Sequence, residues 1–247
     1  MKVLALLPLL ATLLVGQQAR ADDQYPCKPE SDDLMHRWAG LAEMDPAYIV
    51  RRYVGPYTFD IPYGYFTGRS TPERVNCHPQ ETSLEFAFWL PDLRPPKKDM
   101  WYDAYFRPAE EGRPAPGPDE YVVKILGMSF VDTSKGESET PSRAFVNGIY
   151  ADQITQIESK YGMLHRLTDR VGAFEDLFAD LSRPDYKIAM ICTTPGTTDE
   201  NPLCKVRLYL TDLQLEAILL MPVDAVPQWQ KVKDGVRTLV EQWRVKT

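Results

Sequence analysis

The sequence predicts an α+β protein in which helices pack on one face of antiparallel sheets. Three observations support this prediction. Apolar and polar residues alternate in several short runs, as they do in half-buried strands. The last of these runs is followed by a segment whose apolar residues recur at helical spacing. Two cysteines lie at the facing ends of two neighbouring runs, where a disulfide could join them.

Residues 186–243 are predicted to form a C-terminal β-β-β-α unit. Its three alternating runs cover residues 186–192, 204–210 and 213–221, and turn-forming residues separate the first two. Cys192 ends the first run and Cys204 opens the second, both in the apolar register. A cross-strand disulfide between them would close the hairpin.

The helix that closes this unit has an expected N-cap at Asp224 and a proline in its first turn, Pro227, where proline is tolerated. Its apolar residues recur at helical spacing and form one stripe: Trp229, Val232, Val236, Leu239, Val240 and Trp243. We place Lys233 and the other charged residues of the helix away from this stripe. A stripe of this length predicts a helix packed across the sheet.

Earlier segments complete the predicted fold. We expect a helix over residues 32–44 and strands over 57–61, 84–90 and 121–131. Residues 174–181 fit a helix or a strand, and the turn-forming residues that follow favour a hairpin. A further helix is indicated by the spacing of Tyr150, Ile154, Ile157 and Tyr161.

Residues 1–21 have the pattern of a secretory signal peptide. Lys2 precedes an apolar run that is too short to cross a bilayer, and Ala19-Arg20-Ala21 provides a small-x-small cleavage site. Cys27 lacks the preceding residues of a lipid-attachment motif. We therefore expect an exported, periplasmic protein. Residues 22–247 would form one α+β domain, or two lobes that divide near residues 132–142.

The four cysteines predict two disulfides in an oxidising compartment. Hairpin geometry selects Cys192–Cys204, which leaves Cys27 with Cys77; four free thiols are the alternative. A metal site is disfavoured, because no cysteine pair has C-x-x-C spacing and no histidine lies near Cys192 or Cys204. We expect neither a metal nor another cofactor.

The sequence contains no recognisable catalytic motif. It has no G-x-S-x-G, H-E-x-x-H, glycine-rich phosphate loop or dinucleotide fingerprint. His36, His78 and His165 are scattered, and a disulfide at Cys77 would remove the nucleophile of a Cys77–His78 pair. We therefore expect a protein that is not an enzyme. The alternatives are an envelope enzyme with a site assembled from scattered residues, and a non-catalytic accessory protein.

The charge of the chain constrains its partners. The full sequence has a formal net charge of −7, and loss of Lys2 and Arg20 with the signal peptide leaves −9. This balance argues against nucleic acid or an anionic membrane surface as a partner. It is compatible with a basic protein partner.

Residues 91–118 are predicted to form a long irregular loop, because seven of the 21 prolines fall within them. Two interpretations have equal weight. The aromatic residues of this loop either form a surface that binds a partner protein or fix the loop to its own core. In the first interpretation the candidate contacts are Asp92, Trp101, Tyr102, Asp103 and Tyr105.

Four short motifs give the chain a resemblance to a known group of proteins. They are Phe59-Asp60-Ile61-Pro62-x-Gly64-Tyr65-Phe66, Phe88-Trp89-Leu90-Pro91-Asp92-Leu93-x-Pro95, Tyr161-Gly162-Met163-x-His165, and Ile191-Cys192 with Pro202-Leu203-Cys204 and Val226-Pro227-Gln228-Trp229. Together they resemble exported immunity proteins encoded beside type VI secretion effectors, most plausibly lipase effectors. The resemblance implies a protein that binds a cognate toxin in the periplasm and occludes it. It transfers no catalytic residues.

Overall fold

The computed structural model describes residues 45–66, 79–97, 106–132, 154–168, 176–180, 187–193 and 201–246. Within these ranges the chain forms a two-stranded sheet, β1-β2, and an eight-stranded sheet with the order β3-β4-β10-β9-β8-β7-β6-β5. The strands are β1 (Ile49–Val54), β2 (Tyr57–Pro62), β3 (Leu84–Leu90), β4 (Tyr121–Phe130), β5 (Ile154–Lys160), β6 (Met163–Thr168), β7 (Asp176–Ala179), β8 (Ile188–Cys192), β9 (Leu203–Leu210) and β10 (Leu215–Pro222). The helical segments are η1 (Tyr63–Tyr65), η4 (Thr211–Leu213), η5 (Val223–Gln228) and α4 (Trp229–Trp243).

All neighbouring strands in both sheets are antiparallel. The expected strands over 57–61, 84–90 and 121–131 appear as β2, β3 and β4. The three strands of the C-terminal unit appear as β8, β9 and β10. Because β4 pairs with β10, strands from before and after residues 132–142 belong to one sheet. The α+β fold class is confirmed.

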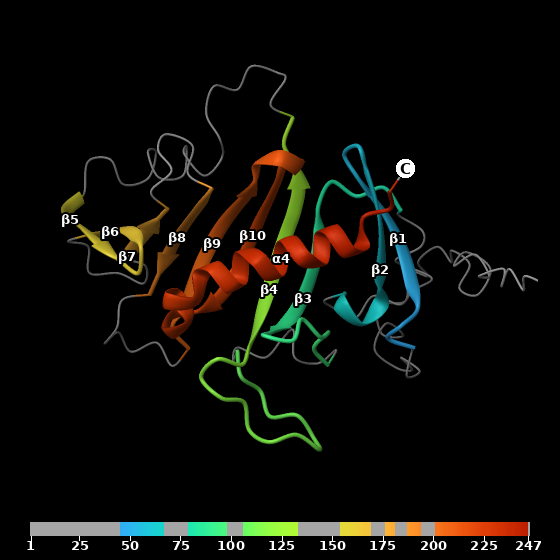
Figure 1. Cartoon of the computed structure of the whole chain (residues 1–247), viewed down its shortest axis with the longest axis horizontal. Helices are drawn as coiled ribbons and strands as arrows, with labels where there is room; N and C mark the ends of the chain where they lie inside the picture. The colour runs from blue at the N-terminus through green and yellow to red at the C-terminus, as the bar shows by residue number, and fades with distance from the viewer. Residues whose placement is uncertain are drawn as a thin grey trace, which may run out of the picture.

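One face of the large sheet is covered by α4, which lies across the strands in Figure 1. The helix buries the stripe expected from its sequence: Val232, Val236 and Val240 are fully buried. At the helix end, the Trp243 ring makes edge contacts with Phe86 at 5.1 Å and with Tyr65 at 4.8 Å between centroids. A Cβ atom at Gly235 would lie 3.1 Å from Phe88 Cε2 on β3, so the small residue allows close approach of the helix to the sheet.

The other face of the sheet is also buried in places. Ala87, Trp89 and Val122 form a small apolar cluster on β3 and β4. A second cluster on β7 and β8 consists of Leu177, Ala179, Ala189 and Ile191. The sequence pattern predicts a half-buried β8, but every residue of this strand is buried. Alternation identified the strand and its helix-facing register, but it did not show that the second face is covered too.

The predicted C-terminal disulfide is confirmed. Cys192 and Cys204 lie directly opposite each other on β8 and β9 and are bonded. The proposed partners Cys27 and Cys77 lie outside the described residues. The signal peptide and the expected helix over 32–44 lie outside them as well.

The start of the closing helix differs from the prediction. A 3-10 helix, η5, precedes α4, and Gln228 rather than Asp224 is the N-cap residue of α4. Pro227 has no N–H and cannot donate the α-helical hydrogen bond to the carbonyl of Val223, which disfavours a regular α-helix that starts at Asp224. Lys233 also differs from its predicted place, because its ammonium lies 5.7 Å from the centre of the Trp229 ring.

The predicted helix around residues 150–161 is wrong in the part that the structure describes. Residues 154–160 are β5, which pairs with β6 in a hairpin. Tyr161 and Gly162 form the two-residue turn, with φ angles of 56° and 72°. Positive φ at both positions matches the twist of a tight hairpin, which outweighed the apparent helical spacing. The hairpin favoured for residues 174–181 is confirmed by the pairing of β7 with β8.

Within the described residues, none of the helices has both the length and the apolar character needed to span a bilayer.

Candidate interaction surface

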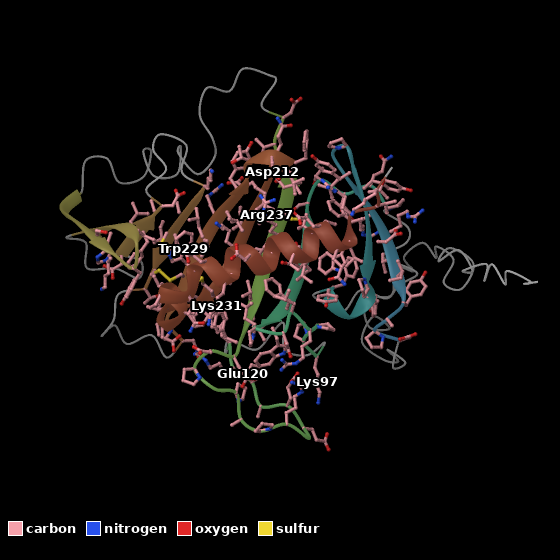
Figure 2. The ribbon with its side chains drawn as sticks, viewed as in Figure 1. Lys97, Glu120, Asp212, Trp229, Lys231 and Arg237 are labelled. Carbon is pink, nitrogen blue, oxygen red and sulfur yellow. A yellow bond between two sulfur atoms is a disulfide. The ribbon has the colours of Figure 1, made fainter. Side chains whose placement is uncertain are left out.

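Among the described residues, the most prominent irregular feature is a loop that projects from the sheet just before β4, at the bottom of Figure 1. We call residues 107–120 the arm. Residues 111–115 form its exposed tip. Figure 2 shows Glu120 and Lys97 where the arm joins the body of the protein. Of the described residues in the predicted 91–118 loop, those of the arm reach farthest from the sheet (Figure 1).

The base of the arm is closed by Arg107. Its Nη2 donates to the carbonyl oxygen of Pro118 at 2.8 Å and to Asp224 Oδ1 at 3.1 Å. The first bond joins the two legs of the arm, and the second fixes it to η5. A further bond, from Gln228 Nε2 to Asp119 Oδ1 at 2.6 Å, joins the returning leg to the same segment. Both legs are therefore attached to the start of the C-terminal helix.

The backbone of the arm is constrained along its length. Prolines occupy positions 108, 114, 116 and 118, and each fixes φ near −65°. The amide of Arg113 donates to the carbonyl of Glu110 at 3.1 Å, which makes a turn that includes Gly112 at φ 78°. A second turn joins Gly117 and Glu120 through two bonds of 3.0 Å. The arm is an ordered projection.

The segment beside the arm is held by Arg94. Its guanidinium lies 4.4 Å from the centre of the Trp89 ring, donates to both Asp92 oxygens at 2.9 and 2.8 Å, and donates to Glu110 Oε2 at 2.7 Å. Burial by itself lowers the pKa of Arg94, but the bonds to Glu110 and Asp92 outweigh burial and raise it. Arg113 extends this network, with Nε 3.6 Å from Glu110 Oε2.

The candidate contacts named from the sequence fall in two groups. Asp92 is exposed, but its carboxylate is already bound to Arg94. Trp101, Tyr102, Asp103 and Tyr105 lie outside the described residues. Phe106, the aromatic residue that follows them, is 6% exposed and packs into the core. In its described part, the loop therefore combines a segment fixed to the core with an exposed tip.

A pocket of about 320 Å³ lies at the base of the arm, near the lower end of the range for ligand-sized cavities. Beside it, Arg107 Nε and the hydroxyl of Tyr121 are buried and have no hydrogen-bond partner among the described residues. Burial raises the pKa of Tyr121. The lining comes from the arm, the β8–β9 connection and η5: Phe106, Arg107, Asn201, Pro202, Pro222, Val223 and Asp224. Three segments distant in sequence thus form one surface with the arm.

The described residues contain no group of three or more His, Cys, Asp or Glu side chains that could hold a metal ion. His165 is buried, stacked on Phe178 with 4.3 Å between ring centres, and its Nε2 lies 3.6 Å from Asp176 Oδ1. This arrangement depends on the register of β6 and β7, which the sequence alone did not reveal. His36 and His78 lie outside the described residues.

Comparison with known proteins gives one informative result. The sequence matches no protein-family model and no curated protein. The structure is similar to that of an immunity protein of the Stenotrophomonas maltophilia type IV secretion system, with a TM-score of 0.51 and 15% identity. The match covers 80% of this chain and 94% of that chain. The two proteins share a fold.

Proposed function

We propose that this protein is an immunity protein that binds one secreted toxin and blocks it. The observation that carries the proposal is the fold shared with a secretion-system immunity protein over most of both chains. The four sequence motifs of residues 59–66, 88–95, 161–165 and 191–229 support it independently. This function needs binding and no catalysis.

The compartment that we propose is the periplasm. The signal-peptide pattern of residues 1–21 supports export, and the Cys192–Cys204 disulfide is typical of a protein that folds in an oxidising compartment. The protein would meet its toxin there, before the toxin reaches its target.

The toxin that we propose is a phospholipase or lipase delivered by a type VI secretion system. The sequence motifs support this class. The solved structure with the same fold belongs to a type IV system, so the secretion route must be tested separately from the immunity function. The product of the adjacent toxin gene is the probe, and its activity on phospholipid vesicles decides its class.

The proposed binding surface is the 91–118 loop together with the pocket at the base of the arm. Trp101, Tyr102 and Tyr105 would be the aromatic anchors, with Asp92 and Asp103 as charge partners. Aromatic anchors of this kind commonly cost about 2 kcal/mol or more on truncation. Protection against repeated delivery requires nanomolar affinity, about −12 kcal/mol.

The test is periplasmic expression of the adjacent gene product with and without this protein. We expect the full-length protein to restore growth, and a version without residues 1–21 to fail because it stays in the cytoplasm. A Trp101→Ala, Tyr105→Ala double variant should protect less well. Growth arrest that persists with the full-length protein, or an adjacent product that is neither toxic nor bound, would refute the immunity function.

A further inference from the structure

We propose that the arm is the inhibitory element, and that its tip, residues 111–115, enters the catalytic cleft of the toxin. This inference rests on the proposed function and extends it. It identifies which surface blocks the enzyme and what shape of partner that surface fits.

The first argument is shape. The arm is a doubled chain whose tip projects from the body, and every residue from Glu111 to Ala115 is exposed. A convex element of this kind fits a concave site better than a flat one. Even paired β-strands lie about 5 Å apart, so a doubled chain needs a groove wider than one that holds a single extended chain. The partner is therefore an enzyme with a wide cleft that accepts extended or membrane-bound substrates.

The second argument is that the arm is ordered before binding. The Arg107 bond to Pro118, the turn bonds of Arg113 and Gly117, and four prolines all restrict its backbone. Ordering a loop on binding opposes association, so a loop that is already ordered loses less entropy. The apolar clusters include Phe106 and Tyr121 on either side of the arm but none of residues 107–120, so the shape of the arm comes from these bonds and prolines.

The third argument is charge. The arm contains four acidic residues and two arginines. Glu110 is bound by Arg94, Asp119 by Gln228, and Glu120 closes a turn at Gly117. The exposed tip contains Glu111 and Arg113. The Arg113 guanidinium lies 3.6 Å from Glu110 and 3.9 Å from Asp92, so its charge is directed at the base of the arm. A cleft with basic side chains at its rim would match Glu111 and would be drawn to the acidic protein as a whole.

The experiment compares two substitutions that add the same charge and a long side chain. Ala115→Arg changes the tip of the arm, and Gln242→Arg changes an exposed position in the last turn of α4. The probe is the purified product of the adjacent toxin gene, and calorimetry gives the dissociation constant. We expect Ala115→Arg to weaken binding about 30-fold or more. Gln242→Arg should change the affinity by less than about threefold, and both variants should have the melting temperature of the wild type.

A second measurement tests entry into the cleft. Inhibition of the toxin is measured at increasing concentrations of a soluble ester substrate. If the arm occupies the cleft, it competes with the substrate, so the apparent inhibition constant of the wild-type protein should rise linearly with substrate concentration. Glu111→Arg should raise the inhibition constant without changing the melting temperature. If wild-type protein binds the toxin but both tip variants bind and inhibit equally well, the arm is not the inhibitory element, while the immunity function stands. If wild-type protein does not bind, both proposals fail.

Discussion

The helix-covered face of the large sheet and the arm are both ordered, but by different interactions. On the covered face, Val232, Val236 and Val240 of α4 are fully buried against a continuous apolar core. The tip of the arm is exposed, and its shape comes from prolines, short turns and the Arg107 bonds.

This difference indicates that the helix-covered face mainly stabilises the fold, whereas the tip of the arm mainly contributes to binding. Burial of one large apolar side chain stabilises the folded state by about 1.5–3 kcal/mol, whereas an exposed ion pair contributes about 0–1 kcal/mol. Substitutions on the covered face should therefore act mainly on unfolding. Substitutions at the tip of the arm should act mainly on binding. Four predictions test this division, in order of expected size.

The largest effect is expected at Trp243. Trp243→Ala removes a ring that is 3% exposed and packs against Phe86 and Tyr65, and it should destabilise the protein by about 3–5 kcal/mol. Urea unfolding measures the change. The neighbouring exposed residue provides the control: Gln242→Ala should stay within about 0.5 kcal/mol. Equal effects of the two substitutions would mean that the helix face is wrongly assigned.

The disulfide should come next. Cys192 and Cys204 are 12 residues apart, and a loop of this length stabilises the folded state by about 3 kcal/mol in the chain-entropy model. The double variant Cys192→Ala, Cys204→Ala should lose about this amount, and adding a reductant should lower the stability of the wild type by more than that of the variant. An unchanged melting temperature in the double variant would contradict the prediction.

Arg107 lies where the two regions meet. Arg107→Ala removes its bonds to Pro118 and Asp224, both near the surface, so the free energy of unfolding should fall by only about 1 kcal/mol. The arm would lose its closure, and toxin affinity should fall about tenfold through lost preorganisation. Arg107→Lys should recover part of the affinity. A large loss of stability with unchanged toxin affinity would mean that Arg107 stabilises the fold and does not order the arm for binding.

The smallest effect is expected at Asp212, which forms an ion pair with Arg237 on α4 (Figure 2). The hydrogen bond from Arg237 lowers the pKa of Asp212. The ion pair therefore contributes fully above the ordinary aspartate pKa of about 3.9, and the contribution is lost as the pH falls through the lowered value. Because the Asp212 side chain is 59% exposed and that of Arg237 36% exposed, solvent screens the pair and Asp212→Asn should cost less than about 1 kcal/mol at pH 7. Urea unfolding from pH 7 to pH 2 should show the free energies of unfolding of the wild type and the variant becoming equal in acid. A difference that stays constant with pH would contradict a contribution from the ion pair.

Much of the fold was predictable because several strands have apolar residues at every second position and the helix has one apolar stripe. The Cys192–Cys204 bond followed from the same alternation, since both residues lie in the apolar register at facing strand ends. The β5–β6 hairpin was missed because its turn contains Tyr161, a residue type that seldom adopts positive φ. Gly162 is a local turn signal, but Tyr161 before it is not.

The interaction surface was only partly predictable. Proline density located the irregular loop, but the closure of the arm joins Arg107 to Asp224 across 117 residues. Such a contact depends on the pairing of β4 with β10, which places two distant segments side by side. For the same reason Asp224 was interpreted as a helix cap, whereas its carboxylate accepts a hydrogen bond from the arm.

The measurement that tests the central claim most directly is a titration of toxin activity. The mature protein is added in steps to the purified product of the adjacent toxin gene, and residual hydrolysis is followed at toxin concentrations well above the expected dissociation constant. The immunity function predicts a linear loss of activity that reaches zero at one equivalent. Full activity in the presence of several equivalents would contradict it.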